Sequence, residues 1–138
     1  MAHGRYGSKG VVLSEQTVKT PEIYLDGMGT LSIDGISIPE NSLEFYRPII
    51  EKVEGLMLDG EVKKVKVNVP YTNTSSSYEL LKVLNTIAVG AERNLRESGT
   101  ERPTVYWLCE EDDYDALEAG VEYAGLVKLP FKIGTILG

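Results

Sequence analysis

The spacing of apolar residues changes several times along the chain, and this alternation constrains the fold more than any other feature. Apolar side chains at every second position are typical of strands, whereas apolar side chains every three or four positions are typical of helices. The pattern predicts strands over 23–25, 30–33, 63–69, 104–109 and 131–137, and helices within 39–60, 77–96 and 113–124. Strands that alternate with helices after an initial hairpin predict an α/β domain with a mixed sheet and about three helices packed on it.

Local signals refine the first part of this prediction. The turn sequence Asp26-Gly27-Met28-Gly29 separates the first two strands and predicts a hairpin. In the first helix, Asn41 followed by Glu44 fits a capping box. Pro48 lies inside this helix, where it removes a backbone hydrogen bond, so we expect a kink or a short first turn there. One face of the helix carries the apolar residues Tyr46, Ile49, Ile50, Val53, Leu56 and Met57.

Length and composition describe an ordinary globular protein. The 138 residues suit one domain, which we expect over 11–138, after a glycine-rich, disordered tail over 1–10. A formal net charge of −7 argues against a nucleic-acid or anionic-membrane partner and favours a protein or a small molecule. The single Cys109 cannot form an internal disulfide, and neither a secretory leader nor a long apolar span is present. A cytoplasmic location is therefore expected.

A run of hydroxyl side chains, "TNTSSS", lies between the predicted strand over 63–69 and the helix that follows it. Ser76 followed by Glu79 fits a capping box for that helix. Thr74 and Ser75 would then lie in the turn just before the helix, where free N–H groups and the positive end of the helix dipole favour an anion. Three interpretations remain open: the hydroxyls cap the helix, bind a phosphate of a ligand, or receive a phosphate themselves. The apolar face of this helix is predicted to contain Leu80, Leu81, Leu84, Ile87, Ala88 and Ala91.

Several enzymatic and metal-binding interpretations fail on the residues present. The hydroxyl run has neither the glycine nor the lysine of a P-loop. His3 is the only histidine and lies in the tail, which excludes a Ser/His/Asp triad or a histidine metal cluster within one chain. Tyr106, Trp107 and Cys109 alternate on a predicted strand and are interpreted as core residues. No cofactor is expected.

An acidic cluster follows that strand. It lacks the alternating ligands and the glycine of an EF-hand loop. Acidic side chains in the first turn of a helix interact favourably with the helix dipole, which explains the cluster without a metal. We therefore predict no metal site at Glu110, Glu111, Asp112, Asp113 and Asp115.

Three stretches carry a resemblance to a known family. They are "TPEIYLDGMGTLSIDGISIPENSLEFYRPI", "VPYTNTSSSYELLKVL" and "VYWLCEEDDYDALEAGVEYAGLVKLPFK". Over 20–132 the chain resembles the SiaC family of bacterial regulatory phosphoproteins, most specifically in "SIPENSLEFY" and "YTNTSS". The resemblance implies a fold similar to STAS domains and anti-sigma-factor antagonists, in which the phosphorylated residue lies at the junction before the second helix.

The resemblance also implies a switch without chemistry of its own. A partner serine/threonine kinase would phosphorylate Thr74, which lies between Asn73 and Ser75, and a metal-dependent serine/threonine phosphatase would remove the phosphate. The unmodified form would bind and activate a diguanylate cyclase, which makes cyclic di-GMP, a signal in biofilm and aggregation control. Thr72 stands where a bulkier apolar residue is expected, and its hydroxyl makes it an alternative acceptor. Ser75 is the other alternative acceptor.

The partner surface is predicted to include Asn73, Thr74 and Ser75, together with Glu40, Asn41 and Tyr46 of "PENSLEFY". Capping and core packing explain the last three residues almost as well. The rival hypothesis is a small-ligand or phosphate-binding α/β domain that uses the hydroxyl-rich helix N-terminus.

Overall fold

The computed structural model describes residues 10–136, so the predicted tail lies outside the described part apart from Gly10. Within 10–136, six strands form one sheet in the order β1-β2-β3-β4-β5-β6. Strands β1, β2 and β3 pair antiparallel, and strands β3 to β6 pair parallel. The strands are β1 (Val11–Ser14), β2 (Glu22–Leu25), β3 (Thr30–Asp34), β4 (Lys64–Asn68), β5 (Thr104–Glu110) and β6 (Phe131–Ile136). The helices are α1 (Ser42–Leu58), α2 (Thr74–Ser98) and α3 (Tyr114–Leu126).

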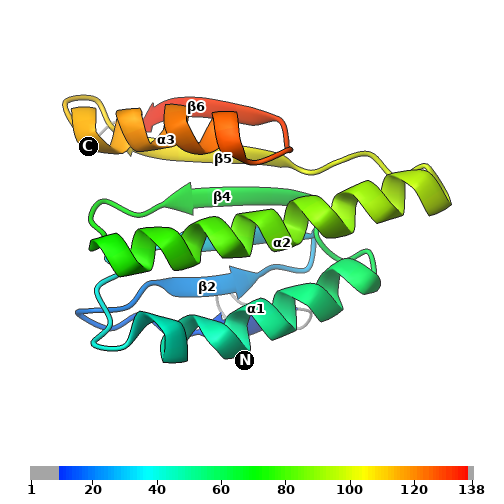
Figure 1. Cartoon of the computed structure of the whole chain (residues 1–138), viewed down its shortest axis with the longest axis horizontal. Coiled ribbons are helices and arrows are strands. Elements are labelled where there is room, and N and C mark those ends of the chain that lie inside the picture. The colour runs from blue at the N-terminus through cyan, green and yellow to red at the C-terminus, as the bar shows by residue number, and fades with distance from the viewer. Residues whose placement is uncertain (1–9, 137–138) are drawn as a thin grey trace.

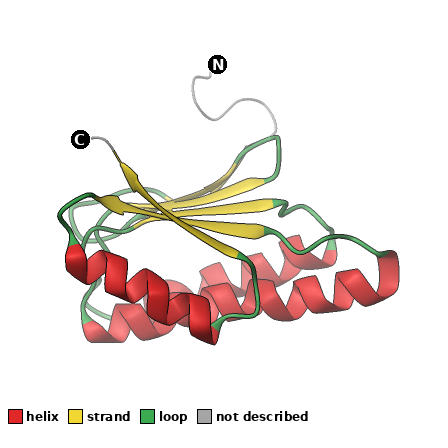
Figure 2. Cartoon of the chain, turned by 90° about the horizontal axis from the view of Figure 1, so that it is seen from above, coloured by secondary structure: helices red, strands yellow, loops and turns green. Residues whose placement is uncertain are grey.

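The three helices cover one face of the sheet (Figures 1 and 2). Each helix connects two neighbouring parallel strands, and the strand order never reverses along the chain. Because such crossovers are right-handed, successive crossovers in one direction place their helices on the same face. The helices α1 and α2 therefore lie side by side, and α3 covers β5 and β6 (Figure 1).

The core lies between this sheet face and the helices. In β4, Val65 and Val67 are fully buried, whereas Lys64 and Lys66 are exposed on the opposite face. This two-residue alternation is expected when one face of a strand packs on the core. The helices contribute residues at helical spacing, namely Tyr46, Ile49, Val53 and Met57 of α1 and Leu80, Val83, Leu84, Ile87, Ala88 and Ala91 of α2.

The predicted hairpin is present, and Asp26 closes it because its carboxylate accepts hydrogen bonds from the backbone N–H groups of Met28 and Thr30. The edge strand β1 was not predicted. The expectation of a short first turn at Pro48 was wrong, since α1 runs continuously from Ser42 to Leu58. Pro48 and Glu44 are both exposed, so water can bind the carbonyl group that the proline leaves without a helical partner. Among the helices described, none is long and apolar enough to cross a membrane.

Candidate phosphorylation site

The candidate site lies where the helices α1 and α2 begin. In a parallel sheet the carboxyl ends of the strands meet at one edge, so the helices that follow them also begin at that edge. The first turns of α1 and α2 accordingly lie at the same end of the molecule (Figure 1). Hydroxyl groups gather there, and we define the hydroxyl cluster as Ser37, Ser42, Tyr46, Thr72, Ser75, Ser76 and Ser77.

Asn73, rather than Ser76, caps α2. Its backbone is extended, with φ −89° and ψ 173°, and its side-chain oxygen accepts a hydrogen bond of 2.9 Å from the backbone N–H of Ser76. The predicted capping box of Ser76 and Glu79 was therefore wrong. Glu79 instead forms an ion pair of 3.2 Å with Lys82. Asparagine is at least as good an N-cap as serine, so α2 begins directly after Asn73, three residues before Ser76.

This correction moves the candidate acceptors into the helix. Thr74 and Ser75 are the first two helical residues of α2 and do not lie in a preceding turn. The backbone N–H groups of a first turn lack partners within the helix, and the dipole is positive there. The expected preference for an anion therefore holds at the observed position as well.

A buried contact joins the N-termini of the two helices. The hydroxyl oxygen of Ser42, the first residue of α1, lies 2.9 Å from that of Ser75 and 3.0 Å from that of Ser76. Ser42 and Ser76 are both buried. Ser42 was not among the predicted site residues, although it follows Asn41 in the "PENS" sequence of the first helix start.

Other members of the cluster are also engaged. The hydroxyl groups of Thr72 and Ser77 lie 2.6 Å apart, and the Tyr123 hydroxyl donates to the Ser77 carbonyl oxygen at 2.6 Å. The Ser37 and Tyr46 hydroxyls form a buried contact of 2.6 Å. Burial raises the pKa of Tyr46 to about 12, and burial likewise raises the pKa of Tyr123. Both phenols are therefore neutral partners at physiological pH.

Thr74 differs from its neighbours. Its side chain is exposed, and within residues 10–136 its hydroxyl makes no hydrogen bond, whereas the hydroxyls of Thr72, Ser75, Ser76 and Ser77 all make one. A hydroxyl without an internal partner can be modified without breaking a native interaction. Among these five side chains, Thr74 is exposed and is the one whose hydroxyl has no hydrogen-bond partner within residues 10–136.

The predicted partner residues from "PENSLEFY" have three different roles. Glu40 is exposed and forms an ion pair of 3.2 Å with Lys19. Asn41 caps α1, because its side-chain oxygen accepts from the backbone N–H of Glu44 at 3.1 Å. Tyr46 has no exposed surface, so its assignment to the partner surface is corrected: it packs in the core and holds Ser37.

The remaining candidates from the sequence are structural. Asp113 caps α3 by accepting from the Ala116 N–H at 3.0 Å, and Asp115 lies in the first turn. Over the described residues 10–136, no group of three or more His, Cys, Asp or Glu side chains is placed to hold a metal ion. Trp107 is buried and donates to the Ala116 carbonyl oxygen at 2.8 Å. Burial raises the pKa of the Cys109 thiol, which disfavours the reactive thiolate.

Comparison with known proteins identifies the family. Residues 14–136 match the SiaC family of regulatory phosphoproteins. An uncharacterized protein of Pseudomonas aeruginosa (strain UCBPP-PA14) is 36% identical over 119 residues, which are 85% of this chain and 90% of that protein. This chain therefore belongs to the SiaC family of regulatory phosphoproteins.

Two solved structures have the same fold. A chain in the crystal structure of the diguanylate cyclase SiaD with its activator SiaC from Pseudomonas aeruginosa superposes with a TM-score of 0.74 at 27% identity, covering 88% of this chain and 96% of that one. The crystal structure of apo-SiaC from the same organism gives a TM-score of 0.72 at 27% identity, covering 90% and 98%. The predicted family and the predicted α/β fold are both confirmed.

Proposed function

We propose that this chain, as one domain over 11–138, is a noncatalytic regulator that binds and activates a diguanylate cyclase and is switched off by phosphorylation of Thr74. A serine/threonine kinase adds the phosphate, a metal-dependent phosphatase removes it, and the exchange takes place in the cytoplasm. The output is control of cyclic di-GMP, and through it of biofilm formation and aggregation. Family membership and the likeness to an activator in complex with a cyclase support the proposal.

The free hydroxyl of Thr74 carries the assignment of the site. Thr74 is exposed and its hydroxyl makes no hydrogen bond to the residues that the structure describes, whereas the rival acceptors Thr72 and Ser75 are already paired with Ser77 and Ser42. Phosphorylation of either rival would break a contact within the hydroxyl cluster. Phosphorylation of Thr74 leaves the cluster intact, so the fold and the switch are separable.

The surroundings of Thr74 suit a phosphate. A phosphate adds about −1.5 to −2 charges and three strong acceptor oxygens. At the first helical residue it would gain roughly 0.3–1 kcal/mol from the helix dipole. The next residue, Ser75, contacts Ser42 at the N-terminus of α1. The phosphate is therefore tolerated by the free protein. A partner packed over Thr74, however, would have to desolvate nearly two charges, which disfavours the complex.

The rival ligand-binding interpretation has less support. A ligand phosphate would need hydroxyl groups that are free to bind it, yet each hydroxyl of the cluster already bonds to another hydroxyl of the cluster. An enzymatic role would need a base next to a nucleophile. No histidine lies within residues 10–136, and Glu79, the buried carboxylate of α2, pairs with Lys82.

Phosphorylation by the cognate kinase followed by fragment mass spectrometry tests the site. We expect one phosphate, on Thr74, no incorporation into Thr74→Ala, and retained incorporation into Thr74→Ser. Phosphate found only on Thr72, Ser75 or Ser77 would contradict the assignment.

A further inference from the structure

The strand β6 leaves one edge of the sheet open. Within residues 10–136 it pairs with β5 alone, and its six residues, Phe131–Ile136, contain neither a proline nor a register shift. The opposite edge strand β1 has four residues and a register shift between Val12 and Ser14. Proteins commonly protect the edges of a sheet with short, irregular or charged strands. By these criteria β1 is protected against pairing with another strand, and β6 is not.

The one charged side chain of β6 does not protect this edge. Lys132 lies on the sheet face that the helices leave open, with its Nζ 5.9 Å from the centre of the Tyr106 ring of β5. It therefore lies over the sheet and not beyond its edge. The backbone N–H of Val105 donates to the carbonyl oxygen of Pro130, so the even-numbered residues of β6 bond to β5. The backbone groups of the odd-numbered residues, such as Thr135, point outward.

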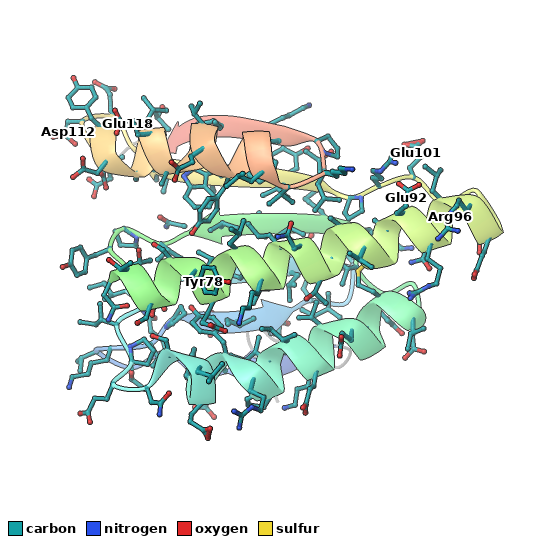
Figure 3. All side chains as sticks on the ribbon, in the orientation of Figure 1. Tyr78, Glu92, Arg96, Glu101, Asp112 and Glu118 are labelled. Atoms are coloured by element: carbon teal, nitrogen blue, oxygen red, sulfur yellow. The ribbon has the colours of Figure 1, made fainter. Side chains whose placement is uncertain are left out.

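The helix α3 has an exposed apolar flank beside this edge. Four of its side chains share one side of the helix, within roughly 80° around the axis. We define the outer flank as these four residues, Tyr114, Leu117, Val121 and Ala124. On the other side of α3, Asp115 and Ala119 line a cavity with Leu80 of α2, so the outer flank is turned away from α2. Among the described residues, Figure 3 shows no other helix on that side of α3.

The apolar surface continues from the outer flank onto the strand. Phe131 and Ile133 lie on the helix side of β6, because their partners in β5 are the buried residues Val105 and Trp107. Both are only partly buried. Val121 of the outer flank is 60% exposed. The hydrophobic core is therefore open to solvent at this edge.

We propose that this edge binds a second copy of the chain, with the two β6 strands antiparallel across a two-fold axis and the two outer flanks packed together. The inference goes beyond the proposed function and does not rest on it. Neighbouring strands lie about 4.8 Å apart, so two α3 helices, each over its own β5 and β6, would be two strand spacings apart, about 10 Å. Helices pack at about 8–10 Å. One arrangement therefore satisfies both strand pairing and helix packing.

The outer flank is complementary to itself in this arrangement. A two-fold axis makes the two α3 helices antiparallel, so the start of each helix faces the end of the other. The bulky residues Tyr114 and Leu117 lie at the start. Ala124 lies near the end, next to Gly125, where an added Cβ atom would meet nothing within 4 Å. Large side chains of one copy therefore meet small ones of the other.

The charges of α3 follow the same order. Asp112 and Glu118 are exposed near its start (Figure 3), and Lys128 is exposed just after its end. In the antiparallel pair, the lysine of each copy lies near the carboxylates of the other, which favours this orientation. The net charge of −7 opposes the approach of two copies, and these contacts offset part of that repulsion. Size and charge therefore both favour a second copy over an unrelated strand.

Sedimentation equilibrium of the full, unphosphorylated chain over a wide range of concentration tests the pairing. The average mass should rise from that of one chain to that of two. Val121→Asp should weaken dimerisation at least about tenfold, because it brings two carboxylates into the contact between the flanks. Thr135→Pro should weaken it as much, because it removes an outward N–H and no bond to β5. The matched control Val89→Asp, at a valine 70% exposed on α2, should change it less than about twofold.

The outcomes decide whether this edge is the interface. A chain that keeps the mass of one copy at every concentration would overturn the inference. A dimer that Val121→Asp and Thr135→Pro leave as tight as in the unaltered chain would overturn it too, because that dimer would use another surface. Loss of the dimer in both variants, with the dimer kept in Val89→Asp, would support it. Circular dichroism verifies that each variant is folded, and none of these outcomes depends on the phosphorylation switch.

Discussion

Ser42 of α1 and Ser76 of α2 are 34 positions apart in sequence, yet their hydroxyl oxygens lie 3.0 Å apart in the buried contact between the two helix N-termini. Ser42 also contacts Ser75 at 2.9 Å, so one side chain of α1 holds two consecutive residues of α2. The contact fixes the start of α2 and leaves Thr74, next to these residues, exposed to solvent. The presentation of Thr74 therefore depends on a contact between helices.

This contact predicts that the effects of substituting Ser42 and Ser76 on stability are not additive. Ser42→Ala and Ser76→Ala should each lower the free energy of unfolding by about 0.5–1.5 kcal/mol, because each removes the same hydrogen bond and leaves a buried hydroxyl without it. Since both variants remove one shared interaction, the double variant should cost less than the sum of the two. Urea unfolding measures all four forms. Strictly additive costs would show that the two hydroxyls do not interact.

The position of the α2 cap predicts that alanine has different effects on stability at two asparagines, Asn73 at the cap and Asn85 inside the helix. Asn73→Ala should cost about 1 kcal/mol of stability, because the N–H of Ser76 loses its acceptor. Asn85 is exposed in the interior of α2, where alanine is the better helix former, so Asn85→Ala should be neutral or stabilising by up to about 0.5 kcal/mol. Thermal unfolding of the two variants and of the unaltered chain measures the difference in stability. Equal effects would argue against Asn73 as the cap.

Two glycines of α3 provide a test of core packing. A Cβ atom at Gly120 would lie 2.5 Å from Cδ1 of Trp107, whereas one at Gly125 would meet nothing within 4 Å. Gly120→Ala should therefore destabilise the fold by roughly 1–3 kcal/mol and change the fluorescence of Trp107. Gly125→Ala should raise stability by up to about 1 kcal/mol through helix propensity alone. A stable Gly120→Ala variant with unchanged fluorescence would contradict the packing described.

The sequence predicted the fold wherever a periodic pattern carried the information. The alternation around Val65 and Val67 marked a strand, and the spacing of Tyr46, Val53 and Met57 marked the buried face of α1. Strand β1 was missed because Val11, Val12 and Leu13 are consecutive apolar residues, which give no two-residue alternation. Its pairing with β2 is a tertiary contact that local spacing does not report.

The candidate site was predicted less completely, for two physical reasons. Asn73 and Ser76 are both good caps with overlapping signatures, and only the backbone geometry shows which of them the helix uses. Ser42 and Tyr46 belong to the site through contacts with residues far along the chain or in the core, so whether each is exposed or buried depends on packing. The hydroxyl run itself lies at the start of α2, between the strand and the helix where the sequence predicted it.

The variant Thr74→Ala should isolate the proposed role of this hydroxyl. Because the Thr74 side chain is exposed and makes no hydrogen bond within the described residues, its removal should change the free energy of unfolding by no more than about 0.5 kcal/mol. The variant should bind the cyclase with or without kinase treatment. Aspartate imitates the phosphate poorly, since it carries one charge on a planar group, so the genuine phosphoprotein is the better comparison.

Calorimetry of the unphosphorylated and Thr74-phosphorylated chains against the cyclase tests the central claim most directly. We expect phosphorylation to weaken binding at least about tenfold, equivalent to about 1.4 kcal/mol, while the melting temperature stays nearly unchanged. Equal affinity of the two forms would contradict the switch, and a large loss of stability would show that the phosphate acts by unfolding the start of α2 and not by excluding the partner.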